Sequence, residues 1–99
     1  MEERPVDRHL QLLRKHLPEL AAQYHVHSLE VFGSYVRDEQ TPESDLDVLV
    51  TFDKTPGLLK YIELEYHLSD LLGVKVDLVM KKALKPRIGE RIFNEALPV

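Results

Sequence analysis

Apolar residues recur along the chain with two different periods, and each period predicts a different kind of element. Between positions 6 and 24 they return every three or four residues, which is the spacing of one helix face. Pro18 lacks the N–H group that a helix interior needs, so we expect a break near Leu17 and a second helix with Pro18 in its first turn. Residues 26–32 alternate between apolar and polar side chains and predict a strand.

The remainder of the chain alternates strand and helix. The predicted elements are strand 45–52, helix 55–73, strand 74–79 and helix 86–96. Thr55 is a good helix cap, Pro56 a good first residue and Gly73 a natural left-handed end. The last helix begins at Pro86, and its expected apolar contacts are Ile88, Ile92, Phe93 and Leu97.

This order of elements predicts an α+β fold in which helices cover one face of a small sheet. Glycine and serine end the first strand, a short helical turn follows over residues 35–37, and a polar loop leads through residues 38–44 to the next strand. We expect one domain over residues 1–99, because a second would have too little chain to build its own core.

Composition narrows the class of protein further. Hydrophobic residues make up 43% and charged residues 30% of the chain, which is typical of a globular protein. Cysteine is absent, which excludes disulfides and thiolate metal sites. The net charge of −4 disfavours nucleic acid as a partner. No apolar run approaches the ~20 residues that cross a bilayer, and the charged segment 1–5 lacks a signal-peptide core, so we expect a cytoplasmic protein.

The second predicted strand opens with two carboxylates on one face. Asp45 and Asp47 are two residues apart, so their side chains share a face and their Cβ atoms lie ~6.6 Å apart. Asp77 falls on the corresponding face of strand 74–79. Three carboxylates on one face repel one another unless cations neutralise them, and hard oxygen ligands favour Mg²⁺ or Mn²⁺. The sequence therefore predicts a divalent-cation site opposite the helices, with Asp77 also placed to help deprotonate a hydroxyl.

A candidate phosphate site precedes the acids. Gly33 lets backbone approach a phosphate closely, and Ser34 adds a hydroxyl at the start of a turn whose amides favour anions. Taken singly, an Asp-x-Asp pair is most often a polar strand edge and a Gly-Ser pair most often a turn. The combination with a third acid on the matching face favours a functional site.

These motifs, Gly33-Ser34 followed after ten residues by Asp45-x-Asp47, resemble the signature of the minimal nucleotidyltransferases, or MntA-type antitoxins, of the DNA polymerase β superfamily. Residues 32–37 and 44–50 resemble the two motif blocks of that family, and residues 74–79 resemble its third-acid strand. The chain departs from many relatives beside Arg37, with valine and aspartate where alanine and glycine are common.

The resemblance implies a polymerase-β-like fold with a small mixed sheet and Mg²⁺-dependent transfer of AMP from ATP, with two Mg²⁺ ions. The implied acceptor is a tyrosine on a HEPN-family toxin, which the enzyme neutralises as the antitoxin of the pair and with which it would form a hetero-oligomer. The implied nucleotide-binding residues are Gly33, Ser34 and Arg37, and the implied catalytic and metal-binding residues are Asp45, Asp47 and Asp77.

Two other functions fit the same residues. A non-catalytic antitoxin would block its partner by binding alone and carry an idle metal site. Transfer to a small molecule is the other, although such enzymes normally use an additional domain. The chain length disfavours it, because a single short domain offers little surface with which to enclose a small acceptor.

Overall fold

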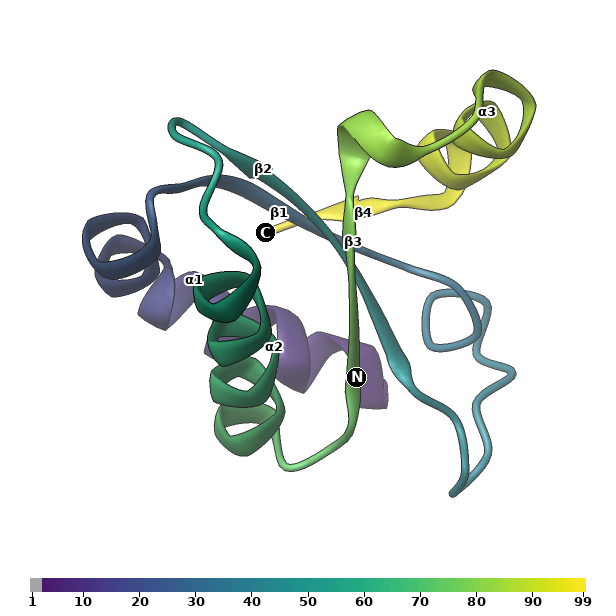
Figure 1. The fold of residues 1–99 in the computed structure, drawn as a ribbon. Coiled ribbons are helices and arrows are strands. Elements are labelled where there is room, and N and C mark those ends of the chain that lie inside the picture. Colours follow the sequence, from purple (N-terminus) through teal and green to yellow (C-terminus); the bar gives the residue numbers. More distant parts are fainter. Residues whose placement is uncertain (1–2) are drawn as a thin grey trace.

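The computed structural model describes residues 3–99 and places a four-stranded sheet against two helices, with a third helix standing apart (Figure 1). Met1 and Glu2, which begin the charged segment noted above, lie outside the described residues. The elements are α1 (Pro5–Tyr24), β1 (Val26–Phe32), β2 (Leu46–Phe52), α2 (Leu58–Leu72), β3 (Val76–Met80), the short 3₁₀ turn η1 (Lys81–Ala83), α3 (Pro86–Glu95) and β4 (Leu97–Pro98). Within residues 3–99, no helix is both long and apolar enough to cross a membrane.

The sheet is mixed and has the strand order β3-β2-β1-β4. β1 pairs antiparallel with β2 and with β4, whereas β2 pairs parallel with β3. A parallel pair needs a crossover connection, and α2 supplies it between β2 and β3. β4 has only two residues, too few to show an alternating pattern, and the sequence prediction did not include it.

The apolar core lies between the sheet and the helices α1 and α2. The side chains that alternate inward from β1 and β2 are almost fully buried there, and leucines of the two helices pack over them. Among the most buried are Leu13, Leu20, Leu29, Val31, Leu46, Val48, Val50, Leu64 and Leu68. Burying a side chain of this size contributes about 1.5–3 kcal/mol. This arrangement confirms the predicted α+β fold, in which helices cover one face of the sheet and the acids lie on the other.

The predicted break in the first helix is wrong. α1 runs unbroken from Pro5 to Tyr24 with Pro18 inside it. A proline in a helix interior costs about 3 kcal/mol, because it removes a hydrogen bond and crowds the preceding turn. Leu13 and Leu20, on either side of Pro18, are both fully buried, and their burial outweighs that cost.

The second helix starts two to three residues later than predicted. Gly57 is its N-cap and Leu58 its first residue, so neither Thr55 nor Pro56 takes the expected role. The Thr55 hydroxyl instead accepts a hydrogen bond from Nζ of Lys82 at 2.9 Å. The predicted end is confirmed: Gly73 closes the helix in the left-handed conformation, with φ 70°.

The third helix is present as predicted, but its expected apolar contacts are largely wrong. Ile88 and Phe93 are 52% and 43% exposed, and Leu97 belongs to β4. Within the described helix Pro86–Glu95, Gly89 alone is buried. Figure 1 shows the reason: α3 lies away from α1 and α2, and its last residue contacts the turn that follows β1. The periodicity indicated a helix, but it could not indicate which surface the helix meets.

Candidate active site

Two of the three predicted acids are direct neighbours in the sheet. The parallel register aligns Asp47 of β2 with Asp77 of β3, and the antiparallel register aligns Phe32 of β1 with Asp47. Paired positions on adjacent strands lie ~4.8 Å apart and point to the same face. Asp45 precedes β2, and its carboxylate lies 3.9 Å from Nζ of Lys75.

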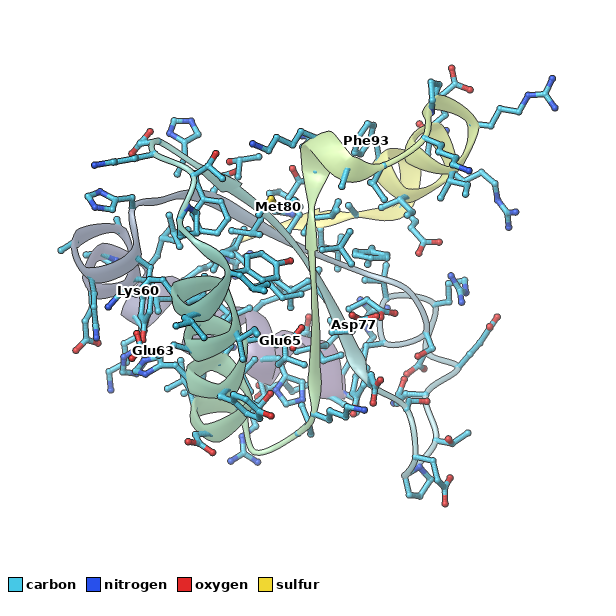
Figure 2. The ribbon with its side chains drawn as sticks, in the orientation of Figure 1. Lys60, Glu63, Glu65, Asp77, Met80 and Phe93 are labelled. Carbon is cyan, nitrogen blue, oxygen red and sulfur yellow. The ribbon has the colours of Figure 1, made fainter. Side chains whose placement is uncertain are left out.

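Asp77 is held in place from the outer edge of the sheet. β3 is an edge strand, and α2 side chains cover the backbone groups beside Asp77: Leu78 N–H donates to Glu65 at 2.8 Å, and the Tyr61 hydroxyl donates to Leu78 C=O at 2.5 Å. Burial, followed by the charges of Glu65 and Asp77, raises the pKa of Tyr61 to about 12. Figure 2 shows Asp77 extending from β3 on the side away from α2.

Asp47 is the most perturbed of these acids. Its carboxyl is half-buried, and burial is the main reason that its pKa rises from 3.8 to about 6; the charges of Asp77 and Asp45 raise it further, and Arg37 lowers it. A carboxylate that is this costly to ionise is a natural ligand for a divalent cation, which offsets the repulsion. The donors are hard oxygens, so they fit Mg²⁺.

The three carboxylates do not form a tight cluster. Among residues 3–99, no three His, Asp or Glu side chains are close enough together to form a ready set of metal ligands. The carboxylate of Asp47 turns toward the Gly33 backbone: a Cβ placed on Gly33 would lie only 2.1 Å from its Oδ2. The predicted metal ligation therefore stays a prediction.

Gly33 is required at its position for two reasons. Its φ is +83°, a conformation that L side chains rarely adopt, and Asp47 fills the space that a side chain would take. The following residues form hydrogen-bonded turns, in which the amides of Val36 and Arg37 both donate to Gly33 C=O. Asp38 ends the turns with φ 60°, a left-handed conformation that aspartate tolerates better than most residues.

A residue absent from the sequence prediction completes this turn. Glu95, the last residue of α3, accepts a hydrogen bond from the Gly33 N–H at 2.6 Å. Nη1 of Arg37 donates to both carboxylate oxygens of Glu95, at 2.9 and 3.0 Å. Glu95 is 62 residues from Gly33 in the sequence, and no local motif marks it.

These groups surround a cavity of about 270 Å³ beside the acid face. Its walls come from the end of β1, the following turn, β2 and α3, and they include Phe32, Gly33, Arg37, Asp47, Arg91 and Glu95. The predicted phosphate-binding residues Gly33 and Arg37 therefore lie beside Asp47, in one hollow. Ser34 begins the turn next to them and is partly buried.

The arrangement of acids, glycine turn and arginine can be compared with that of known proteins. The family model described as "Nucleotidyltransferase domain" matches residues 13–99. The chain belongs to this family. It is accordingly a nucleotidyltransferase by family, and the predicted enzyme class is confirmed.

Named relatives support the same family assignment. A Methanocaldococcus jannaschii protein, MJ0128, is 58% identical over 89 residues, which cover 89% of this chain and 91% of the relative; its name assigns it provisionally as a protein adenylyltransferase. The protein adenylyltransferase MntA of Thermococcus cleftensis is 48% identical over 88 residues, which cover 89% of each chain. The resemblance to the minimal nucleotidyltransferases is thus confirmed.

Solved structures confirm the fold. One, described provisionally as a minimal nucleotidyltransferase, superposes with a TM-score of 0.75 at 39% identity and covers 91% of this chain and 92% of the other. A second is a toxin-antitoxin crystal structure with AMP-PNP, which superposes with a TM-score of 0.66 at 25% identity and covers 90% of this chain and 67% of the other.

Proposed function

We propose that this chain transfers AMP from ATP to a tyrosine of a cognate HEPN-family toxin, in a Mg²⁺-dependent reaction, and so acts as the antitoxin of a toxin-antitoxin pair. The observation that carries this proposal is the alignment of Asp47 with Asp77 beside the Gly33 turn, in a chain of the nucleotidyltransferase family. The names of the relatives support the protein acceptor and the nucleotide, since one is a protein adenylyltransferase and another structure pairs a toxin-antitoxin with AMP-PNP.

The proposed roles follow from the placement of each group. Asp45, Asp47 and Asp77 would hold Mg²⁺, and cations bound there would neutralise the carboxylates and stabilise the charge that develops on the transferred phosphoryl group. Gly33 N–H, the Ser34 turn and Arg37 would bind phosphate oxygens of ATP, because backbone amides and a guanidinium are strong donors to anions.

The chemical step is an in-line displacement. The tyrosine oxygen would attack the α-phosphorus of ATP, the bond from that phosphorus to the bridging oxygen of pyrophosphate would break, and pyrophosphate would leave. The phenolic proton would pass to Asp77, which is exposed on the acid face and so accessible to a hydroxyl that arrives on a partner protein.

A protein partner is also consistent with the outer surface of α2. Four large apolar side chains are exposed along this helix, at positions spaced for one side of it: Leu58, Leu59, Ile62 and Tyr66. Contiguous exposed apolar side chains are typical of protein interaction surfaces. We assign this surface to the toxin.

The proposal is tested by incubating the protein with α-³²P-labelled ATP, Mg²⁺ and the toxin encoded beside it. Label should transfer to a toxin tyrosine with the wild type and fall to background with Asp45→Ala/Asp47→Ala. Glu19→Gln, which removes an exposed acid from α1, is the matched control and should label like the wild type, because Glu19 lies on a different helix from the surface assigned to the toxin. Equal labelling by the double variant would contradict the catalytic assignment.

The same variants distinguish transfer from simple binding. If the antitoxin acts by transfer, Asp45→Ala/Asp47→Ala should still bind the toxin but should no longer neutralise it in a growth assay. Full neutralisation by this variant would instead show that the chain blocks its partner by binding alone.

A further inference from the structure

Glu95 lies where an anionic ligand would lie. Its carboxylate accepts the Gly33 N–H through one oxygen, and Arg37 binds both oxygens at 2.9 and 3.0 Å. A backbone amide beside a left-handed glycine, together with a guanidinium, binds a carboxylate or a phosphate strongly. The Gly33 N–H and the Arg37 guanidinium thus form a phosphate seat. The Glu95 side chain is 26% exposed, so solvent screens this contact only in part.

Charged side chains of both signs lie around this seat. Asp47 and Arg91 line the same cavity, and Asp45 and Asp77 are close enough for their charges to act on Asp47. Arg37 is the cation that contacts Glu95, and it is shared with Glu39 at 3.3 Å. Glu95 therefore adds a further negative charge beside the acids and uses the guanidinium that would otherwise be available to a ligand.

The helix that carries Glu95 is attached to the rest of the molecule by few contacts. Within Pro86–Glu95 only Gly89 is buried, and Ile88 and Phe93 are both exposed by more than two fifths. Besides the contacts of Glu95, α3 is held by Lys81, whose Nζ lies over the Phe93 ring, 4.9 Å from its centroid. Among residues 3–99, the core cluster has no member in α3, whereas β4, which begins two residues after Glu95, pairs with β1 and keeps the end of the helix on the sheet. The body of α3 can therefore move away from the turn without opening the core.

We propose that Glu95 is a built-in competitor for the phosphate seat, and that α3 is a strap which closes the ligand-free site and is displaced when a triphosphate binds. The inference rests on the proposed nucleotide site at Gly33 and Arg37. A triphosphate carries several negative charges and would replace a single carboxylate on the same two donors. Ligand binding would thereby free α3 and uncover the acid face on which the acceptor must arrive.

The contact itself can be tested without any ligand. Hydrogen–deuterium exchange of the α3 amides should be faster in Glu95→Gln than in the wild type, because the neutral amide keeps the shape but loses the charged pair with Arg37. Glu90→Gln, the same change at an exposed position of α3, should exchange like the wild type. Equal exchange in all three proteins would overturn the strap.

Competition is measured by calorimetry with inorganic triphosphate and with AMP-PNP. Removing a charge-assisted contact that competes with the ligand should tighten binding to Glu95→Gln by roughly tenfold, whereas Glu90→Gln should bind like the wild type. Either ligand should also speed exchange of the α3 amides in the wild type. Unchanged or weaker binding to Glu95→Gln would overturn the proposal.

These results separate the inference from the proposed function. Unchanged affinity in Glu95→Gln, with normal labelling of the toxin, would refute the competitor and leave the enzyme intact. Tighter binding in Glu95→Gln, with labelling that does not need Asp45 and Asp47, would support the competitor and refute the catalytic assignment.

Discussion

Gly33 is the residue at which backbone conformation and site chemistry are most closely joined. Its positive φ turns the chain out of β1, its missing side chain leaves room for the Asp47 carboxylate, and its N–H binds Glu95. A glycine is needed for the first two, and the third follows from the turn that they create. Sequence reasoning found this residue because glycine after a strand is a recognisable signal, whereas the contact with Asp47 became visible only in the fold.

Gly33→Ala should lower both stability and nucleotide binding. The left-handed φ costs about 1 kcal/mol or more for alanine, and the methyl group must push Asp47 aside. Gly73→Ala is the matched control, because Gly73 has φ +70° but no atom within 4 Å of the added Cβ. Thermal unfolding should show a loss in both variants, and AMP-PNP calorimetry should show a loss in Gly33→Ala alone. Equal affinity in the two variants would contradict the role given to Asp47.

Asp47 should make stability depend on pH in a defined direction. The pKa of Asp47 is raised to about 6 in the folded protein, from 3.8 in the unfolded chain. The contribution of this carboxyl to stability is therefore fully present below about pH 4 and is lost as pH rises through 6. Without divalent cations, Asp47→Asn should therefore increase the free energy of unfolding at pH 8 by about 1–2 kcal/mol and change it little at pH 4. Urea unfolding measures both values, with Asp70→Asn as control. A gain of the same size at both pH values would show that the charge is not the cause.

The site was predictable from sequence only where strands fixed it. Alternation along β2 and β3 places Asp47 and Asp77 on one face, and the parallel register makes them neighbours. Glu95 was not predictable, because the return of a helix end to Gly33 depends on the path of the whole chain. Nor could alternation show that Asp47 turns toward Gly33, since a strand period defines a face and leaves the rotamer open.

At the scale of elements, two of the errors arise where tertiary packing overrules a local signal. Pro18 is a strong local breaker, yet the leucines on both sides of it are buried and keep α1 continuous. Thr55 is a good cap, yet its hydroxyl binds Lys82. Elements whose signals agree with their packing, such as β1 and the Gly73 end of α2, fall where they were predicted.

Pro18→Ala should stabilise the protein. Alanine restores the N–H that can donate to the carbonyl four residues earlier, and it removes the crowding of the proline ring. The unfolded chain gains some freedom, so the net increase in the free energy of unfolding should be about 1–2 kcal/mol. Pro5→Ala, at the first position of the same helix, should give no gain, because that N–H has no helical partner. Chemical denaturation compares them, and equal effects would contradict this account.

At the scale of the whole molecule, the fold assigns different tasks to the two faces of one sheet. α1 and α2 bury the first face and supply most of the core, and the second face carries the acids under the partial cover of α3. The core packed against the first face therefore keeps in place the strands that position Asp47 and Asp77. As a consequence, the carboxylates on the acid face repel one another, in a chain of net charge −4.

That repulsion predicts how the whole molecule responds to Mg²⁺. At pH 8 and ten times its dissociation constant, Mg²⁺ should raise the free energy of unfolding by about 1.4 kcal/mol, which corresponds to a rise in melting temperature of roughly 5–10 °C for a domain of this size. The rise should be much smaller at pH 5, where Asp47 is protonated, and EDTA should reverse it. Asp47→Asn/Asp77→Asn should lose the response, whereas Asp70→Asn should keep it. A response that survives in the double variant would place the cation elsewhere, because those two neighbouring carboxylates are the part of the predicted site that the sheet itself positions.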